Sequence, residues 1–376
     1  MFLALRELSF ARGRFALMGS VVALIGVLMV LLSGLSVGLV NDGVSGLQKL
    51  PVSSFAFESG ADKGAAFSRS VVAPETAEVW ANVAGVAEAA PFGITLVNTR
   101  TDRGVDVDLA LFGVETDSWL LPTAAVGGPV AGPDQVLLAG TLQDEGVAVG
   151  DLVRVDQLDR ELEVVGFLDG QHTYGHVDAG YVDLPTWQEI RAGVRPGDSA
   201  PDHVYEEVTS IAVLNDSGGE PDLSAGDAAA GTTSMTLEES FGASPGYTAE
   251  TTTVQMIQWF LYAISALVVG AFFTVVTIQR RQEIAVMRAM GASTGYLLRD
   301  SLTQSVILLL VATALGVGVG LLLGARLSAS AMPFALEPVA VAVASAFLVI
   351  LGLIGAVFGV LRVTRVDPLT ALGGSR

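Results

Sequence analysis

The sequence contains no cysteine and only two lysines in 376 residues. Without cysteine there can be no disulfide, so a domain outside the cell must rely on its own apolar core, and the redox compartment stays open. Neither Lys49 nor Lys63 ends the glycine-rich turn that cradles nucleotide phosphates. The chain therefore cannot hydrolyse ATP by that route, and ATP-driven work would need a second subunit.

Other catalytic patterns are also missing. Neither H-E-x-x-H nor G-x-S-x-G occurs, and the long apolar runs are nearly free of the ionisable side chains that a proton relay needs. We therefore expect a non-catalytic protein that is not driven by protons. His172 and His176, with Asp169 or Asp178, have the residue types of a metal site, but a solvated hairpin tip explains the same letters.

Charge is segregated along the chain. Residues 41–252 hold 34 acidic and 9 basic side chains, a net charge of −25, and the rest holds 5 acidic and 11 basic ones, a net of +6. With 51% hydrophobic residues and a mean hydropathy of +0.57, this is the pattern of a membrane protein with one large acidic domain. We expect no nucleic acid partner.

Four apolar runs are long enough to cross a bilayer, which takes about 20 helical residues. They cover residues 15–40, 253–278, 301–325 and 339–361. The first run exceeds the ~7–15 apolar residues of a cleavable secretion signal, so we expect an uncleaved anchor. The sequence thus predicts an α-helical membrane protein with four transmembrane helices.

Arginines set the predicted orientation through the positive-inside rule. They cluster in residues 1–14, 279–300 and 362–376, which we expect to be cytoplasmic. Both termini would then lie on the cytoplasmic side of the cell membrane. Residues 326–338 would form a short outer loop, and residues 41–252 a single extracytoplasmic domain.

The extracytoplasmic domain reads as α+β. Short β-branched runs between Gly, Pro, Asp and Asn are typical of strands, and a brief helix is expected at Pro185–Ala192. We expect a mixed or antiparallel sheet from Ile94–Asn98, Val105–Gly113, Gln135–Ala139, Leu152–Val155, Glu161–Leu168, Gly180–Val182 and Ser210–Leu214. We expect a helix at Glu75–Ala90, although Gly85 weakens that prediction. The composition of Asn215–Thr236 is typical of a mobile loop or linker.

Glycines four residues apart allow two helices to approach closely. The third run carries three of them, Gly316, Gly320 and Gly324, which predicts packing against a neighbouring helix. We interpret the single pairs Gly34/Gly38 and Gly355/Gly359 as the ordinary glycine enrichment of transmembrane helices.

A short basic segment, Gln279–Ser293, separates the second and third runs. As a helix it would place an apolar stripe on one face and charges on the other, so it would need a membrane or a partner protein to pack against. A positively charged loop that only fixes topology would show the same composition. The stripe comprises Ile284, Met287, Arg288 and Gly291, with Arg280, Arg281 and Glu283 partly on the other side.

The pattern R-x-E-I-A-V-x-R-A-M-G-A, from Arg281 to Ala292, resembles the cytoplasmic loop of FtsX/MacB-like (type VII) ABC transporter permeases. That resemblance implies a coupling helix that contacts a separate ATPase subunit. The residues that carry it here are Arg281, Glu283, Ile284, Met287, Arg288 and Gly291.

Other parts of the chain resemble the same family. Val363–Gly374 carries R-x-x-P-x-x-A-L, residues 1–14 fit an N-terminal amphipathic helix on the lipid surface, and VLLAGTLQDEGVAVGDLVRV is similar to the family's outer domain. The resemblance implies an assembly of two permease copies with two ATPase subunits, which hold ATP and Mg, and no intrinsic cofactor in the permease.

The opening FLALRELSFARGRFALMGSVVALI is most similar to the permeases of haem-exporting transporters of Gram-positive bacteria. This implies haem as the transported ligand, taken up between the first two helices, where thioether, phenolate or carboxylate groups can ligate iron. The candidates are Met29, Met256, Tyr262 and Glu58. Packing or interface roles explain the same side chains, and another lipophilic or peptide cargo, or mechanotransmission to extracellular partners, remains an alternative.

Overall fold

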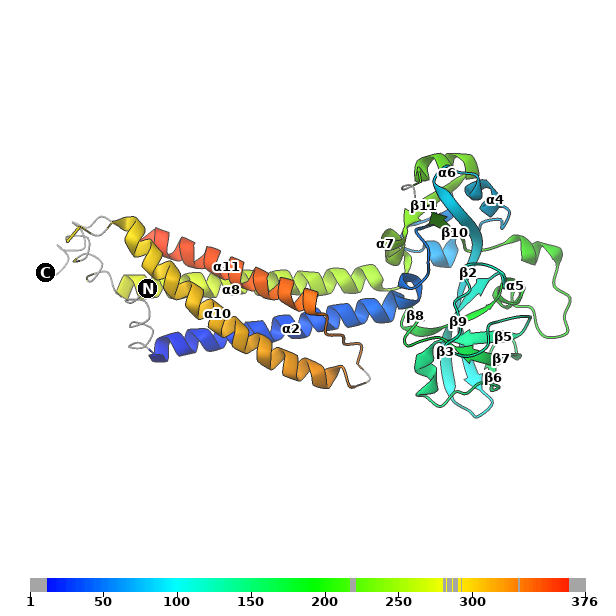
Figure 1. The fold of residues 1–376 in the computed structure, drawn as a ribbon, viewed down its shortest axis with the longest axis horizontal. Helices are drawn as coiled ribbons and strands as arrows, with labels where there is room; N and C mark the ends of the chain where they lie inside the picture. Colours follow the sequence, from blue (N-terminus) through cyan, green and yellow to red (C-terminus); the bar gives the residue numbers. More distant parts are fainter. Residues whose placement is uncertain are drawn as a thin grey trace. The chain divides into compact units, whose positions relative to one another are not determined.

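The computed structural model describes residues 12–216, 221–279, 282, 286, 290–291, 293–330 and 332–364. The chain divides into two compact units, which are treated separately below (Figure 1). Residues 1–39 and 251–376 form the helical unit, and residues 40–250 form the outer domain. The family motif of the C-terminal tail and the N-terminal amphipathic segment before Arg12 lie outside the described residues.

Four helices are long and apolar enough to span a membrane. They are α2 (Arg12–Gln48), α8 (Tyr247–Gln279), α10 (Thr294–Leu327) and α11 (Pro338–Thr364). All four extend beyond the apolar runs of the sequence, most clearly α2, which ends at Gln48, α8, which begins at Tyr247, and α10, which begins at Thr294. The extension of α2 forms because Val44 and Leu47 are fully buried in the core of the outer domain.

The helical unit packs through its glycines. A Cβ atom built on Gly316 of α10 would collide with the carbonyl oxygen of Ala23 on α2, and one on Gly320 would lie 2.7 Å from Cβ of Val30. The predicted packing of the triple glycine ladder is therefore confirmed: Gly316 and Gly320 pack against α2, and Gly324 packs against Phe334 and Leu336 of the loop before α11. A backbone approach this close is possible only where both helices carry small residues or gaps.

The interpretation of the single glycine pairs was wrong. Gly355 and Gly359 of α11 approach the carbonyl oxygens of Ala266 and Gly270 on α8, so neither has room for a side chain. Likewise Gly34 and Gly38 make room for the loop that carries Phe334, whose neighbour Ala335 donates a backbone hydrogen bond to the Gly34 carbonyl at 3.1 Å. Gly355 and Gly359 therefore allow the close α8–α11 contact, and Gly34 and Gly38 allow the loop before α11 to pack against α2.

The start of α2 lies beside the end of α8. The guanidinium of Arg14 donates a hydrogen bond to the side-chain oxygen of Gln279, and the rings of Phe15 and Phe272 meet edge to face at 5.6 Å. These two helices therefore run antiparallel, as two successive spans joined by an outer domain must.

The outer domain is built on a mixed 11-stranded sheet. Most neighbouring strands pair antiparallel, but β3 with β9 and β5 with β7 pair parallel. The strands are β1 (Ser54–Glu58), β2 (Val86–Thr101), β3 (Asp106–Val114), β4 (Val126–Gly127), β5 (Gln135–Leu138), β6 (Leu152–Val155), β7 (Arg160–Phe167), β8 (Thr173–Tyr174), β9 (Val177–Asp183), β10 (Ser210–Asn215) and β11 (Thr232–Thr236).

Short helices cover this sheet. The α-helices are α3 (Ala66–Arg69), α4 (Thr76–Ala81), α5 (Leu184–Ala192), α6 (Leu223–Ala230) and α7 (Leu237–Ser240), and the 3₁₀ turns are η1 (Gly140–Gln143), η2 (Asp202–Glu206) and η3 (Phe241–Ala243). The predicted helix at Pro185–Ala192 corresponds to α5. Its Trp187 is fully buried over Gly93 and Gly113, a cross-strand pair where no Cβ would fit.

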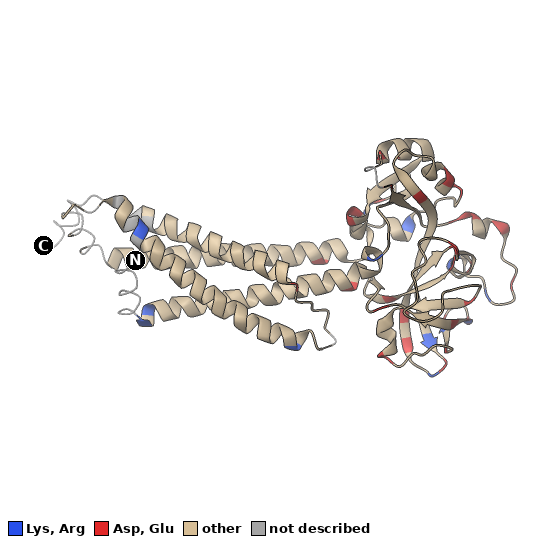
Figure 2. Cartoon of the chain, viewed as in Figure 1, with Lys and Arg blue, Asp and Glu red and all other residues tan. Residues whose placement is uncertain are grey.

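The core contains two apolar clusters. One is rich in edge-to-face aromatic contacts, such as Phe112 with Tyr181 at 5.2 Å, and the other holds Trp80 and Trp187. Their burial replaces the disulfides that the sequence lacks. A buried Arg160 is neutralised by Asp134 and Glu189, each 2.5 Å away. Acidic side chains gather over this domain and are sparse along the helices (Figure 2).

Two local predictions were wrong. The expected helix at Glu75–Ala90 ends after α4, because Gly85 has φ +87 and the chain then enters the 16-residue strand β2. The expected linker at Asn215–Thr236 holds α6 and β11, and β11 pairs with β1 along five residues. In both stretches, pairing within the sheet outweighs a composition that is weak in strand formers.

Candidate functional site

The candidate cargo residues fall into separate environments. Met29 of α2 and Tyr262 of α8 are 2% and 7% exposed and belong to one apolar cluster, with Ile25 and Leu348. The thioether and the phenol are therefore brought together by α2, α8 and α11 inside the helical unit. Of the four candidates predicted from the sequence, Met29 and Tyr262 are the two that the structure places in one cluster.

Tyr262 also belongs to an aromatic group. Its ring lies 5.8 Å from that of Trp259 and 5.9 Å from that of Phe347 of α11. Trp259 is 60% exposed, so the group reaches the surface of the helical unit. Trp259 and Phe347 are exposed and offer aromatic faces to a flat apolar ligand, whereas Met29 and Tyr262 are buried beneath them.

Met256 and Glu58 are placed differently. Met256 is 53% exposed on α8 and lies outside the Met29–Tyr262 cluster. Glu58 ends β1, opposite Thr232 of β11, and belongs to the outer domain. Its carboxylate is exposed at the end of β1, a strand that lies between β11 and β10 in the sheet.

Most of the candidate coupling residues, namely Arg281, Glu283, Ile284, Met287 and Arg288, lie outside the described residues. Gly291 is described, and its φ of +95 is a left-handed conformation that residues with a side chain rarely adopt. Two residues later Ser293 caps α10, its hydroxyl accepting a hydrogen bond from the Tyr296 amide at 3.2 Å. Gly291 thus lies at a turn just before α10.

A second cluster, not predicted, lies in the outer domain and involves the tip of the β8–β9 hairpin. Gly175 and His176 form the two-residue turn with φ +60 and +68, as a type I′ turn requires. His176 Nδ1 lies 2.8 Å from Asp42 Oδ2, and its Nε2 lies 3.1 Å from Glu250 Oε1. We call these three residues the His176 clasp.

The clasp joins the end of α2 to the start of α8 through one imidazole. A neutral imidazole has one N–H donor, and both carboxylates only accept, so both hydrogen bonds form together only when the ring is protonated. Burial lowers the pKa of His176, but the hydrogen bond to Asp42 and the charges of Glu250 and Asp42 outweigh it and raise the pKa above its ordinary value.

Further hydrogen bonds hold the same hairpin on α2. The Gly175 amide donates to the Gly43 carbonyl at 2.8 Å, and the Thr173 amide donates to the Ser45 hydroxyl at 3.0 Å. Lys49 donates to the Gln171 carbonyl at 2.7 Å. The hairpin and the residues just before it therefore form hydrogen bonds with Gly43 and Ser45 of α2 and with Lys49, which follows the helix.

The other groups of the possible metal site do not converge on His176. His172 is buried, and burial together with the Lys49 charge lowers its pKa, which favours the neutral ring. Asp178 accepts a hydrogen bond from the Thr141 hydroxyl, and burial raises its pKa. Among the described residues no group of three His, Cys, Asp or Glu side chains is arranged to hold a metal ion.

From the sequence, His176 was a candidate metal ligand, but its partners Asp42 and Glu250 were not predicted. Asp42 and Glu250 are 134 residues before and 74 residues after it. The only available signal is that each carboxylate flanks an apolar run at the boundary of the acidic domain. Their convergence follows from the fold, which brings the two ends of the outer domain together.

Comparison with known proteins agrees with this architecture. Residues 256–368 match the family model "FtsX-like permease C-terminal". The chain is 24% identical over 374 residues to "Putative hemin transport system permease protein HrtB" of Staphylococcus epidermidis, covering 100% of this chain and 99% of the relative. It is also 24% identical over 385 residues to an uncharacterised ABC transporter permease of Mycobacterium tuberculosis, covering 100% and 99%.

Two solved structures resemble parts of the chain. The extracellular domain of the noncanonic ABC-type transporter YknZ from Gram-positive bacteria covers 49% of this chain and 98% of its own, with 13% identity and a TM-score of 0.35. The periplasmic region of MacB from Actinobacillus actinomycetemcomitans covers 51% and 92%, with 11% identity and a TM-score of 0.37.

The four apolar helices and the permease match define a membrane protein with an extracellular domain. Residues 256–368 form an FtsX-like permease domain, and the chain as a whole is similar to ABC transporter permeases.

Proposed function

We propose that this permease expels haem from the membrane, driven by a separate ATPase subunit. The observation that carries the proposal is the alignment of the whole chain with relatives named as hemin transport permeases in two Staphylococcus species. The chain has no phosphate-binding lysine motif of its own, so ATP hydrolysis is assigned to the partner. Both termini and the coupling segment are assigned to the cytoplasm by their arginines.

Met29 and Tyr262 are the proposed haem contacts. A phenolate or thioether can serve as an axial ligand of haem iron, and the aromatic group around Tyr262 offers a face for the porphyrin. Both side chains are buried in a single copy, so ligand entry requires α2 and α8 to separate, and a second copy would complete the site. Met256 is the weaker candidate because it lies outside this cluster.

A haem titration of the purified permease and ATPase in nanodiscs tests this assignment. Tyr262→Phe removes only the phenol oxygen and Met29→Leu only the thioether, so both keep the packing. We expect a saturable shift of the Soret band that one of these variants weakens, while exposed Met256→Leu leaves it unchanged. A band identical in all variants would overturn the site, and no saturable binding would overturn haem as the cargo.

Mechanotransmission is the second candidate, and the His176 clasp favours it. The clasp ties a hairpin of the sheet to the ends of α2 and α8, the two helices that continue into the helical unit. Movement of either helix would then pull on the extracellular domain. An exporter can use the same connection, so the transport measurement described in the Discussion separates the two.

A further inference from the structure

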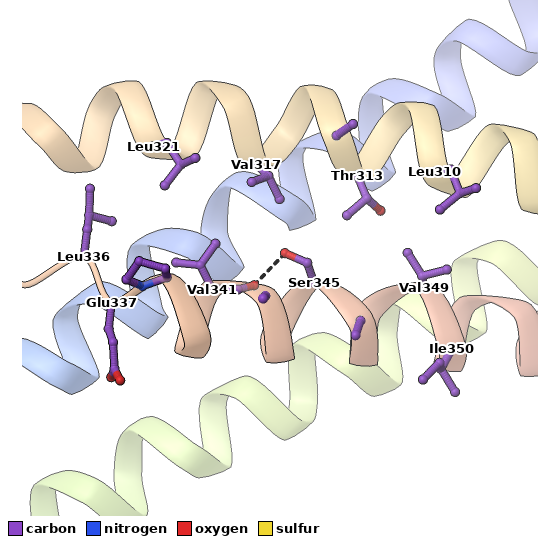
Figure 3. Close-up of a pocket in the computed structure, with 14 residues that line it drawn as sticks. Leu310, Thr313, Val317, Leu321, Leu336, Glu337, Val341, Ser345, Val349 and Ile350 are labelled. Carbon is purple, nitrogen blue, oxygen red and sulfur yellow. Dashed lines mark hydrogen bonds between the residues drawn. The ribbon is translucent and has the colours of Figure 1, made fainter.

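A pocket of about 750 Å³ lies between α10 and α11, within the helical unit (Figure 3). This volume falls within the ~300–1,000 Å³ of small-molecule sites. Leu310, Val317 and Leu321 line it from α10, and Val341 and Val349 line it from α11. Figure 3 shows the α10 side chains directed toward α11, so this apolar space separates two helices that otherwise pack together.

The pocket has the depth of one membrane leaflet. From Leu310 to Leu321 the axis of α10 rises about 17 Å, at ~1.5 Å per residue, roughly half of a ~30 Å hydrocarbon core. The pocket begins at the loop before α11 and ends near the middle of that helix, at Ile350. Its length and position match an acyl chain that enters from the surface nearest this loop.

Two polar features distinguish the pocket from an ordinary apolar groove. Thr313 is only 5% exposed, its Oγ1 has no hydrogen-bond partner among the described residues, and Figure 3 shows it directed toward α11. In contrast, Ser345 is satisfied by the Val341 carbonyl at 2.7 Å. A buried hydroxyl without a partner is costly, so Thr313 is the one strained polar position in an otherwise apolar lining.

Glu337 stands at the end of the pocket, immediately before α11. Its side chain is exposed, and it forms no ion pair with any residue in the described ranges. It is the one acidic residue in the described part of the chain after residue 300, and the exposed Arg326 in the last turn of α10 is the basic residue at the same end. A cationic group is the complementary partner for this carboxylate, whereas an anionic headgroup would be repelled.

These features do not fit haem. None of the 14 lining residues is His, Cys, Met or Tyr, so the pocket offers no usual iron ligand. The propionates of haem would also meet the Glu337 carboxylate. The pocket is therefore distinct from the proposed cargo site at Met29 and Tyr262.

We propose that the α10–α11 pocket binds a phospholipid with an ammonium headgroup. One acyl chain fills the apolar space past Thr313, and the ammonium pairs with Glu337. Bound lipid would hold α10 and α11 at a fixed spacing.

Photo-crosslinking of the full-length permease in nanodiscs tests this proposal. The probe is phosphatidylethanolamine with a diazirine on one acyl chain, compared with phosphatidylglycerol of the same chains. Ala342→Trp fills the pocket from an exposed position, and Val343→Trp, at the next residue but outside the lining, is the matched control. Thermal unfolding of both variants shows that they are folded.

We expect labelling of the peptides around 310–321 and 341–350 to fall about five-fold or more in Ala342→Trp and to persist in Val343→Trp. Glu337→Gln should lower the preference for phosphatidylethanolamine about two- to five-fold, since an exposed pair contributes little more. Equal labelling by both lipids, or labelling unaffected by Ala342→Trp, would overturn the proposal. Crosslinks between these peptides of two copies would instead identify the pocket as a subunit interface.

Discussion

The imidazole Nδ1 of His176 lies 2.8 Å from the carboxylate Oδ2 of Asp42, although 134 residues separate them in the chain. The other ring nitrogen meets Glu250. One protonated side chain therefore joins the end of α2 to the start of α8 at the boundary of the outer domain. This arrangement makes the connection between the two helices sensitive to pH.

The clasp predicts a pH-dependent stability. Because the pKa of His176 is raised in the folded chain, its contribution is fully present below the unfolded value of about 6.5 and is lost as pH rises through the folded value. His176→Gln should destabilise the hairpin by about 1 kcal/mol or less at pH 6, and its effect should fade by pH 9.

Hydrogen exchange of the Thr173–Asp178 amides in the full chain, corrected for the intrinsic pH dependence, measures this effect. His203→Gln is the control, since His203 is exposed on η2. An effect of His176→Gln that is equal at both pH values would mean that the clasp does not depend on the protonated ring.

The glycine contact between α2 and α10 gives a stability prediction. Gly316→Val places methyl groups where Ala23 already puts its backbone, and it should cost about 1–3 kcal/mol or prevent assembly. Gly318→Val lies two residues along the same helix with nothing within 4 Å, so its cost should be about 0.5 kcal/mol or less. Thermal unfolding in detergent checks both, and equal losses would contradict this packing.

The coupling segment gives a third prediction through Gly291. An alanine at φ +95 is strained by about 1–2 kcal/mol, so Gly291→Ala should reorient the segment and weaken binding of the ATPase subunit by about five-fold or more. Gly295→Ala, in the first turn of α10, is the control and should bind normally.

Glu283→Lys should weaken the same interaction by reversing a charge in the coupling segment. Surface plasmon resonance with the immobilised ATPase subunit measures all three variants. Unchanged affinity in both Gly291→Ala and Glu283→Lys would show that the segment does not couple to the ATPase.

The four membrane-spanning helices could be predicted from the sequence because hydrophobic length is a local property of each segment. The seven expected strands correspond to β2, β3, β5, β6, β7, β9 and β10 for the same reason, since each has its own β-branched pattern. β1, β4, β8 and β11 were missed. Thr232–Thr236 becomes a strand only because Ser54–Glu58 is available to pair with it.

The functional residues were less readable. Met29 and Tyr262 were chosen one by one for their chemistry, and only the fold shows that they share a cluster that Met256 does not join. The His176 clasp and the α10–α11 pocket depend on residues far apart in the chain. No periodicity or spacing within one segment encodes such contacts.

The most direct test of haem export is ATP-driven transfer of haem out of proteoliposomes that contain the permease and its ATPase subunit. Apomyoglobin outside the vesicles reports haem release through its own Soret band. We predict release that requires ATP and is reduced at least several-fold in Tyr262→Phe or Met29→Leu, with Met256→Leu unaffected. ATP hydrolysis at the normal rate without haem release would contradict export and favour mechanotransmission or a different cargo.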